Sequence, residues 1–318
     1  MGRGAASSAL QAEFGVPLQM EVAGASPAVL AIGNFDGVHL GHQELLAAGT
    51  KLARSRGAEL VAITFEPHPR QVLGPDRSVS LLTPLEMRRR LLARHGVHRL
   101  EVMPFDQHLL TLSPGEFLDR LRARRQVVGI VAGPRLSIGR GEEGGLDFVR
   151  AYAARTGIEL VVVDEVGSGG LEISSTAIRE RLAASDLEAV ARMCGRSFRV
   201  LGEVEAGDRR GRQLGFPTAN LRLLPAQLLP PDGVYVMRLE VDGREPLPAV
   251  GSIGTRPQFG PGERKFEVHA LAPPGDLYGL EVEVEVLHWL RAQAIFGSQR
   301  DLVTQMERDR AQANAHFA

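Results

Sequence analysis

Hydrophobic residues in the first part of the chain fall into short aliphatic runs that alternate with amphipathic stretches. The runs predict buried strands at 28–32, 59–65, 99–103, 127–132 and 158–163. The amphipathic stretches have helical periodicity, as in the one that carries Leu45, Leu46 and Leu52 and ends near Gly57. Strands that alternate with helices predict an α/β fold, a doubly wound parallel sheet covered on both faces.

Two of the predicted helices begin with a capping-box sequence. Thr83-Pro84-Leu85-Glu86 and Ser113-Pro114-Gly115-Glu116 each place a hydroxyl residue three positions before a glutamate, with a proline between them. We therefore expect Thr83 and Ser113 to be the N-caps of these helices. A further helix is predicted to open at 174–176.

After Gly195 the pattern changes to the period of two that is typical of half-buried strands. Residues 198–204 and 234–241 alternate, and the apolar residues of 280–286 alternate with Glu281, Glu283 and Glu285, which predicts one face in water. Helical periodicity returns at Ser298, an N-cap for a helix to about Ala315. This half is predicted to be a small antiparallel β-barrel with a terminal helix. We place the two domains at 17–186 and 187–318.

Bulk composition narrows the function classes. A chain of 318 residues with a net charge of −1 fits two globular domains without a general attraction to nucleic acid or membranes. Cys194 is the one cysteine, and no apolar run is long enough to span a bilayer. Residues 1–20 lack the apolar core of a signal peptide. We expect a cytoplasmic protein. Its arginine runs at 88–90 and 120–125 are expected to be solvated helix faces, the alternative being a basic patch for nucleic acid.

The segment from Ile32 to His42 joins the first predicted strand to the first helix. Gly37 and Gly41 allow a ligand to approach the backbone, and the helix start favours a phosphate. His39 and His42 are expected on one face, where they would stabilise charge on a phosphoryl group. The alternative is that one histidine caps the helix and the other lies on the surface. Neither of the two lysines follows a glycine-rich P-loop pattern.

Other segments that follow predicted strands are expected near the same edge of the sheet. Residues 34–42, 66–69, 133–139 and 173–176 all come after strands. In a doubly wound sheet the ligand crevice lies at the carboxyl ends of the strands, so we predict that these segments converge there.

The second half contains a further candidate site between Gly211 and Asn220. Its glycines suit a nucleotide's phosphates, and Thr218 and Asn220 offer hard oxygen ligands for Mg²⁺. The alternative is a polar β-turn. Glu267, in a later strand, is a candidate proton acceptor for phosphoryl transfer, and the alternative is a solvent-facing glutamate.

Several of these segments resemble known signatures. G-N-F-D-G-V-H-L-G-H at 33–42 resembles the nucleotidylyltransferase signature and, in its longer form, the bacterial bifunctional riboflavin kinase/FAD synthetase family. I-S-S-T-A-I-R at 173–179 is similar to the second adenylyltransferase signature. The segments G-R-Q-L-G-F-P-T-A-N-L, D-G-V-Y-V, S-I-G-T-R-P-Q-F, F-E-V-H and D-L-Y-G occur in the order seen in riboflavin kinase modules. The resemblance covers about residues 20 to 316.

The resemblance implies two reactions, phosphorylation of riboflavin to FMN by ATP and adenylylation of FMN to FAD with release of pyrophosphate. It implies Glu267 as the base of the kinase and His39 and His42 as catalytic residues of the adenylyltransferase. Mg²⁺ is the implied cofactor, held by Thr218 and Asn220, and Arg291 and Phe296 are implied to bind the flavin. The implied nucleotide- and phosphate-binding residues are Gly33, Phe35, Asp36, Gly41, Ser174, Ser175, Thr176, Arg179, Gly211, Arg212, Gly215 and Pro217. Flavoprotein clients are compatible with this function.

The chain also departs from the family's pattern. Where the family carries G-x-[ND]-F-x-F-G, residues 133–139 are G-P-R-L-S-I-G, so Arg135 replaces a polar residue and aliphatic residues replace both aromatic ones. Gln293 and Gln258 replace the usual Glu and Thr. Two alternatives therefore stay open. One is a riboflavin kinase whose adenylyltransferase domain is impaired, and the other is a flavin-binding protein that catalyses neither step.

Overall fold

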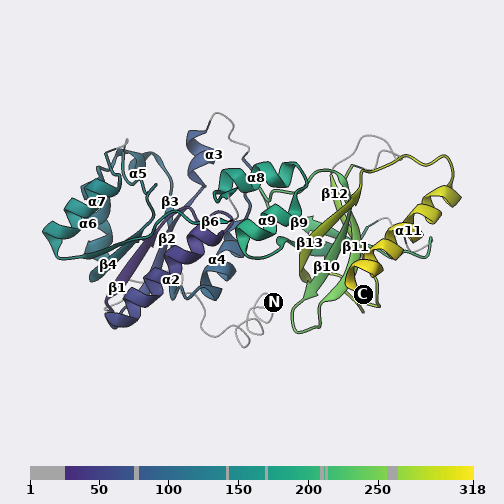
Figure 1. Cartoon of the computed structure of the whole chain (residues 1–318), viewed down its shortest axis with the longest axis horizontal. Helices are drawn as coiled ribbons and strands as arrows, with labels where there is room; N and C mark the ends of the chain where they lie inside the picture. The colour runs from purple at the N-terminus through teal and green to yellow at the C-terminus, as the bar shows by residue number, and fades with distance from the viewer. Residues whose placement is uncertain are drawn as a thin grey trace, which may run out of the picture. The chain divides into compact units, whose positions relative to one another are not determined.

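The computed structural model describes residues 26–74, 79–140, 143–168, 171–207, 211, 214–255 and 264–318 (Figure 1). Its contacts divide the chain into two units between Ser174 and Ser175. The predicted boundary between residues 186 and 187 separates two functions, and it stays a prediction. The start of the first domain at residue 17 and Gln258 lie outside the described residues.

The first unit contains a five-stranded sheet in the order β3-β2-β1-β4-β5, and every neighbouring pair is parallel. This confirms the predicted doubly wound sheet. Its strands are β1 (Ala28–Ile32), β2 (Glu59–Glu66), β3 (Arg99–Pro104), β4 (Val127–Ala132) and β5 (Glu159–Val162). Its helices are α2 (Leu40–Ser55), α3 (Pro69–Leu73), α4 (Leu85–Arg94), α5 (Gln107–Thr111), α6 (Pro114–Arg124) and α7 (Leu146–Thr156). The short strands β6 (Gly167–Ser168) and β7 (Leu171–Glu172) form a hairpin after β5.

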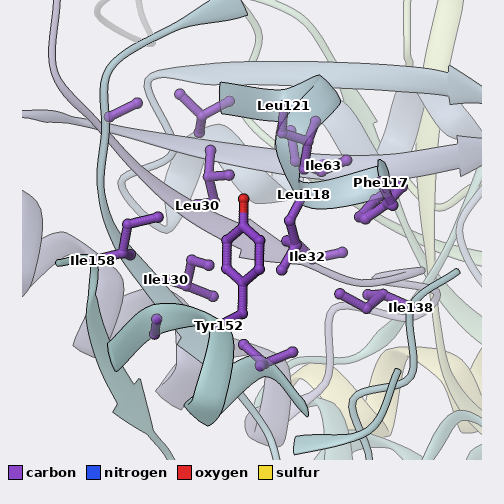
Figure 2. Packing of buried hydrophobic residues seen from close by; sticks show 14 of the residues in the cluster. Leu30, Ile32, Ile63, Phe117, Leu118, Leu121, Ile130, Ile138, Tyr152 and Ile158 are labelled. Carbon is purple, nitrogen blue, oxygen red and sulfur yellow. The ribbon is translucent and has the colours of Figure 1, made fainter. Parts of the chain in front are cut away.

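Alternate residues of β1 enter two hydrophobic clusters, as the period of a strand requires. Val29 and Ala31 belong to one cluster, and Leu30 and Ile32 belong to the other. Figure 2 shows the second cluster, in which the Tyr152 ring lies among labelled aliphatic side chains of the sheet and helices. Both faces of the central strand are therefore dry, so the polar chemistry of this unit is confined to the ends of its strands.

The two predicted capping boxes have different outcomes. Ser113 caps α6 and forms the full capping box with Glu116, as predicted. Thr83 does not cap α4, because the helix begins one residue later with Pro84 as the N-cap and no capping side chain. The Thr83 hydroxyl instead accepts a hydrogen bond from the Gly37 N–H at 2.7 Å. The prediction for Thr83 was wrong because a distant loop uses that hydroxyl.

The second unit is a closed antiparallel barrel in the order β10-β11-β12-β9-β8-β13, preceded by two helices and followed by one. This confirms the predicted barrel and terminal helix, and Ser298 caps that helix as predicted. The elements are α8 (Ser175–Ala183), α9 (Leu187–Cys194), β8 (Phe198–Glu205), β9 (Ala219–Leu223), β10 (Gly233–Val241), β11 (Leu247–Gly254), β12 (Lys265–Ala270), β13 (Glu281–Arg291) and α11 (Gln299–Phe317). None of the helices in the described ranges has the length and hydropathy needed to cross a bilayer.

The polar face of β13 is less wet than its alternation predicts. Glu285 is 5% exposed, and Arg199 and Arg238 donate to its carboxylate at 2.5 and 2.6 Å. Burial would lower the pKa of Arg199, but its bond to Glu283 and the charges of the neighbouring glutamates outweigh burial and raise that pKa. The expected solvated face is therefore wrong at Glu285, because arginines from β8 and β10 cover it.

Candidate active sites

The loop after β1 is held in an unusual backbone conformation. Phe35 and Val38 have positive φ values of 51° and 37°, in the left-handed region that side chains with a Cβ rarely adopt. Both side chains are completely buried, and this packing holds the backbone in place. Gly37, with φ of 87°, supplies the third left-handed residue. Strain of this kind, kept by surrounding structure, is a feature of functional loops.

The two histidines lie together at the start of α2, as the sequence predicts. Their rings stack with centroids 3.8 Å apart at an angle of 18°. The rings of Phe35 and His42 pack edge to face with 5.2 Å between their centroids. A Cβ on Gly41 would lie 3.3 Å from His39 Nδ1, so glycine leaves room for the stacked pair. The sequence therefore places both imidazoles, His39 being 7% exposed, beside a helix start.

Asp36 is buried and serves the loop. Its carboxylate accepts hydrogen bonds from the Thr83 N–H at 2.9 Å and the Leu82 N–H at 3.3 Å. These bonds fasten the loop after β1 to the segment that enters α4. The nucleotide-binding role that the family resemblance implies for Asp36 stays a prediction, as do those for Gly33, Phe35 and Gly41.

Arg88 is a buried residue of this site that the sequence reasoning missed. Its Nη1 donates to Thr64 Oγ1 and its Nη2 to the Thr83 carbonyl, both at 3.2 Å. Thr64 in turn donates to the Asn34 carbonyl at 3.1 Å. We call Asp36, Thr64, Thr83 and Arg88 the buried polar network. It connects the loop after β1, strand β2 and the start of α4.

The positive charge of Arg88 is opposed by two carboxylates, Asp36 within the network and Glu66 outside it. Burial lowers the pKa of Arg88, and the charges of Asp36 and Glu66 oppose that shift. Burial also raises the pKa of Glu66, with Arg88 opposing the shift and Asp36 adding to it. Arg88 was expected on a solvated face, but it is fully buried. Its spacing of three and four from the buried Leu91 and Leu92 was the signal that places it on the inner face of α4.

The second adenylyltransferase signature crosses the division between the units. Ser174 ends the first unit, and Ser175, Thr176 and Arg179 lie on α8 in the second. Within α8, Arg179 donates to the Ser175 carbonyl at 3.1 Å. Arg135, in the altered segment after β4, belongs to the first unit and pairs with Glu165 and Glu172.

The second candidate site is a pocket of ≈ 220 Å³ in the barrel unit. Glu267 on β12 and Thr218 before β9 both line it, together with Gly211 from the glycine loop. The two residues implied to bind flavin, Arg291 and Phe296, line the same pocket. Lining residues that the sequence reasoning did not single out are Ser252, His269, Leu302, Met306 and Asp309, with apolar neighbours.

The glycine loop turns tightly beside this pocket. Gly211 accepts backbone hydrogen bonds from Leu214 at 3.0 Å and Phe216 at 2.8 Å, and a Cβ there would lie 2.3 Å from the Phe216 carbonyl. Gly215 has φ of 82°. The Pro217 carbonyl is 2.8 Å from His269 Nδ1. Arg212 lies outside the described residues, so its implied phosphate contact stays a prediction.

Asn220 lies directly opposite Glu267 in the register of β9 and β12. Its Oδ1 is buried and accepts no hydrogen bond from the residues that the structure describes. A Cβ at Gly207 would lie 2.1 Å from Asn220 Nδ2, so the backbone packs closely on the amide. Asn220 is not among the residues that line the pocket, although Thr218, two positions earlier, and Glu267 are. A buried oxygen without a donor, opposite a carboxylate in the strand register, fits a hard divalent cation.

The terminal helix closes one side of the pocket. Arg291 donates to both carboxylate oxygens of Asp309, with Nη2 to Oδ2 at 2.6 Å and Nε to Oδ1 at 3.0 Å. Asp309 is 3% exposed, and the Arg291 guanidinium lies 5.8 Å from the centroid of Phe296. The sequence does contain a signal for Asp309, since Leu302, Met306 and Ala313 share its face of α11. Gln293 donates to the Ile253 carbonyl at 3.0 Å and so ties the same loop to β11.

The chain matches two protein families over most of its length. Residues 22–177 match the FAD synthetase family, and residues 194–317 match the riboflavin kinase family. These families use ATP, generally with a divalent metal ion. The first match covers the sheet unit and ends within α8. The second match covers the barrel and α11.

Curated relatives match nearly the whole chain. The bifunctional riboflavin kinase/FMN adenylyltransferase of Escherichia coli K12 is 35% identical over 91% of this chain and 92% of its own length. The protein of the same name from Bacillus subtilis is 33% identical with the same coverage. A crystal structure described as a macrolide-efflux protein from Streptococcus pneumoniae is similar with a TM-score of 0.82 and 31% identity, covering 91% of this chain and 94% of that one.

Proposed function

The chain belongs to the family of bifunctional riboflavin kinase/FMN adenylyltransferases, and from that premise we propose how its two candidate sites divide the chemistry. The enzyme phosphorylates riboflavin to FMN with one ATP and adenylylates FMN to FAD with a second ATP. We assign the first reaction to the barrel pocket and the second to the loop after β1. The observation that carries the assignment is that Glu267, Thr218, Arg291 and Phe296 line one pocket.

In the kinase site Glu267 is the general base. The terminal hydroxyl of riboflavin attacks the γ-phosphorus of ATP, its proton passes to the Glu267 carboxylate, and the bond from phosphorus to the bridging oxygen breaks to release ADP. An alcohol needs such a base because it is not ionised at neutral pH. Glu267 lines the pocket and lies opposite Asn220, and this position supports the role of a base over that of a solvent-facing strand residue.

Thr218 and Asn220 would hold Mg²⁺ with the phosphates of ATP. The buried Asn220 Oδ1 and the Thr218 hydroxyl are oxygen ligands of the type that Mg²⁺ prefers. When bound, the cation neutralises charge on the phosphates. Gly211, Gly215 and Pro217 shape the loop beside them, and Arg212 is proposed to reach the same phosphates.

In the adenylyltransferase site the attacking group is the phosphate of FMN. It is largely ionised at neutral pH, so the reaction needs charge stabilisation rather than a base. His39 and His42 donate hydrogen bonds to the α-phosphate of ATP as pyrophosphate leaves. Gly33, Phe35, Asp36 and Gly41 give the loop its shape. Ser174, Ser175, Thr176 and Arg179 are proposed to bind ATP phosphates through hydroxyls and a guanidinium.

Arg291 shapes the flavin-binding side of the barrel pocket. Its guanidinium is committed to the buried Asp309, so we infer that it acts on the flavin chiefly by holding Phe296 and the terminal helix in place. Delivery of FAD to flavoprotein clients and a cytoplasmic location stay predictions.

One assay tests the assignment. Purified full-length protein is incubated with riboflavin, ATP and Mg²⁺, and riboflavin, FMN and FAD are separated by chromatography over time. We expect FMN to form first and FAD to follow, and chelation of the metal to stop FMN formation. A wild type that makes FMN and never FAD would overturn the adenylyltransferase assignment in favour of a kinase alone, the alternative that the altered segment 133–139 raises.

A further inference from the structure

The segment after β4 lies at the point where the order of the sheet reverses. β1 pairs with β2 on one side and with β4 on the other, so the loops after β1 and β4 leave the sheet in neighbouring positions. In doubly wound sheets this is where ligands bind. The loop after β1 carries the histidine pair. The loop after β4 carries Arg135, which follows the last residue of the strand by three positions.

This edge of the sheet must accept polyanions but contains few cations. ATP carries several negative charges, and the phosphate of FMN carries about 1.5 to 2 at neutral pH. Five segments directly follow the strands, namely 33–39, 67–68, 105–106, 133–139 and 163–166, and all of them are described. Arg135 supplies the one Arg or Lys within these segments, and Arg140 follows later in the loop after β4, whereas Asp36, Asp106, Asp164 and Glu165 are acidic.

The interactions that Arg135 makes in this structure are weak. Its Nη1 lies 2.9 Å from Glu172 Oε1, its Nε lies 3.3 Å from Glu165 Oε1, and its Nη2 donates to the Ile173 carbonyl at 3.5 Å. The side chain of Arg135 is 58% exposed, and those of Glu165 and Glu172 are 59% and 69% exposed. Ion pairs this exposed contribute about 0–1 kcal/mol, because water screens them. A doubly charged phosphate can therefore displace them.

The shape of the segment does not depend on those ion pairs. Ile138 is 4% exposed and belongs to the hydrophobic cluster in which Figure 2 labels it with Phe117 and Ile32. Its N–H donates to the Gly144 carbonyl at 3.1 Å, and a Cβ on Gly139 would lie 2.6 Å from Pro114 N. Buried packing thus anchors the backbone, while the Arg135 side chain extends from an exposed turn.

We propose that Arg135 is a phosphate-binding residue of the adenylyltransferase site, held by Glu165 and Glu172 until a substrate phosphate takes their place. The ligand is a phosphate group of ATP or of FMN, and the experiment separates the two. The inference rests on the assignment of adenylyl transfer to the first unit. It gives the departure at 133–139 a positive role, since Arg135 adds a cation where the family pattern has a neutral or acidic residue.

The test measures kcat and the KM for ATP and FMN during FAD formation from supplied FMN, ATP and Mg²⁺. The full-length variants are Arg135→Gln, the double variant Glu165→Gln/Glu172→Gln, and the triple variant that combines them. Arg140→Gln, at an exposed arginine of the same loop, is the matched control. FMN formation from riboflavin is measured for every variant as a check on the kinase, and denaturant unfolding is measured as a check on the fold of the sheet unit.

We expect Arg135→Gln to raise the KM for one substrate about tenfold, the effect of losing one charge-assisted hydrogen bond, with a smaller change in kcat. That substrate identifies the phosphate. The double variant should lower the same KM about threefold, because its competitors for Arg135 are gone. The triple variant should match Arg135→Gln, since the gain needs the guanidinium.

Three results would overturn the proposal. The first is an Arg135→Gln enzyme with both KM values unchanged. The second is a double variant whose KM rises as it does in Arg135→Gln, which would make the ion pairs a structural clasp. The third is a triple variant whose KM is lower than that of Arg135→Gln. This would show that removing the charges of the two glutamates improves binding without the Arg135 guanidinium. A wild type that forms no FAD overturns the proposed function itself, and the Arg135 assignment falls with it.

Discussion

The two candidate sites hold their reactive side chains by different means. In the sheet unit, the histidine pair lies at the end of a strained loop that a buried polar network fastens to a second strand and a helix start. In the barrel unit, Glu267 and Asn220 are held opposite each other by the backbone register of two strands, and a terminal helix closes the pocket through the Arg291–Asp309 pair.

This difference affects how each site responds to substitution. A loop held by a few buried polar side chains loses its shape when one of them is removed, because the remaining groups are left buried without partners. A strand register is fixed by many backbone hydrogen bonds, so a side chain on it can be changed with little effect on the fold. We therefore expect chemical substitutions in the barrel to act cleanly on rate, and substitutions in the network to act on rate and stability together.

The largest effect is expected for Glu267→Gln in the barrel. The change keeps the shape of the side chain and removes the proton acceptor, so FMN formation should fall by about 10²–10⁴. FAD formation from supplied FMN should persist, and the thermal unfolding temperature should stay near that of the wild type. Glu281→Gln, at an exposed strand glutamate, is the control. An unchanged kinase rate would return Glu267 to a structural role.

The network should show the opposite behaviour when Arg88 is replaced by Met. Removing the buried cation leaves the Thr64 hydroxyl and the Thr83 carbonyl without their donor and takes away the charge that opposes those of Asp36 and Glu66. Disrupting a buried charged network in this way typically costs about 3–5 kcal/mol. We expect the free energy of unfolding of the sheet unit to fall by that order, and Arg88→Lys to restore part of it. FAD formation should fall while FMN formation persists.

Arg89→Met is the matched control for Arg88. Its side chain is 31% exposed and pairs with Glu86 one turn away, so its loss should change stability by less than about 0.5 kcal/mol. Equal losses from both substitutions, measured by denaturant unfolding, would show that the network does not fasten the loop.

The sequence predicted the secondary structure better than it predicted contacts between residues that are far apart in the chain. The strand periods, the barrel and the placement of both histidines on one face followed from local spacing, because short runs of residues set period and helix face. The use of Thr83 by Asp36 and Gly37 could not follow, because the partners are 46 and 47 positions apart. The burial of Arg88 and Asp309 was visible in helix spacing, but charge type alone suggested solvent.

For the site residues, the family resemblance implies the roles, whereas the fold sets the positions. The pairing of Asn220 with Glu267 depends on strand register, which no local pattern specifies, and the family resemblance supplied their roles before the register was known. The ion pairs of Arg135 depend on Glu165, before the hairpin of β6 and β7, and on Glu172 within it, 37 positions later in the chain. Family motifs do not predict such contacts where the chain departs from them.

A chemical substitution in the sheet unit should have the next largest effect. His42→Ala removes one hydrogen-bond donor to the α-phosphate, so FAD turnover should fall by about 10²–10³ with less change in the KM for ATP. FMN formation should be unaffected, because its residues lie in the barrel. His108→Ala, at an exposed histidine, is the control. A wild type with measurable FAD formation and a His42→Ala variant of equal turnover would show that the histidines only pack the loop.

The smallest effect on rate should come from separating the units. Residues 187–318 contain every residue that we assign to the kinase, so this fragment should form FMN at about the rate of the full chain. It also keeps α9, whose buried Leu187, Val190 and Met193 pack on the barrel side of the division. A folded fragment without kinase activity, beside an active full chain, would show that the barrel site is incomplete alone.

The position of the cut should matter for stability even where it does not matter for rate. Asp186 caps α9 by accepting a hydrogen bond from the Ala189 N–H at 3.1 Å, and α8 packs on α9. A fragment that starts at residue 187 loses this cap, which typically costs about 1 kcal/mol, and it also loses the buried contacts of α8. A fragment that starts at residue 175 keeps both, so we expect it to unfold at higher denaturant concentration with the same rate of FMN formation. Equal midpoints for the two fragments would place the stable boundary at the predicted 186/187 rather than where the contacts divide.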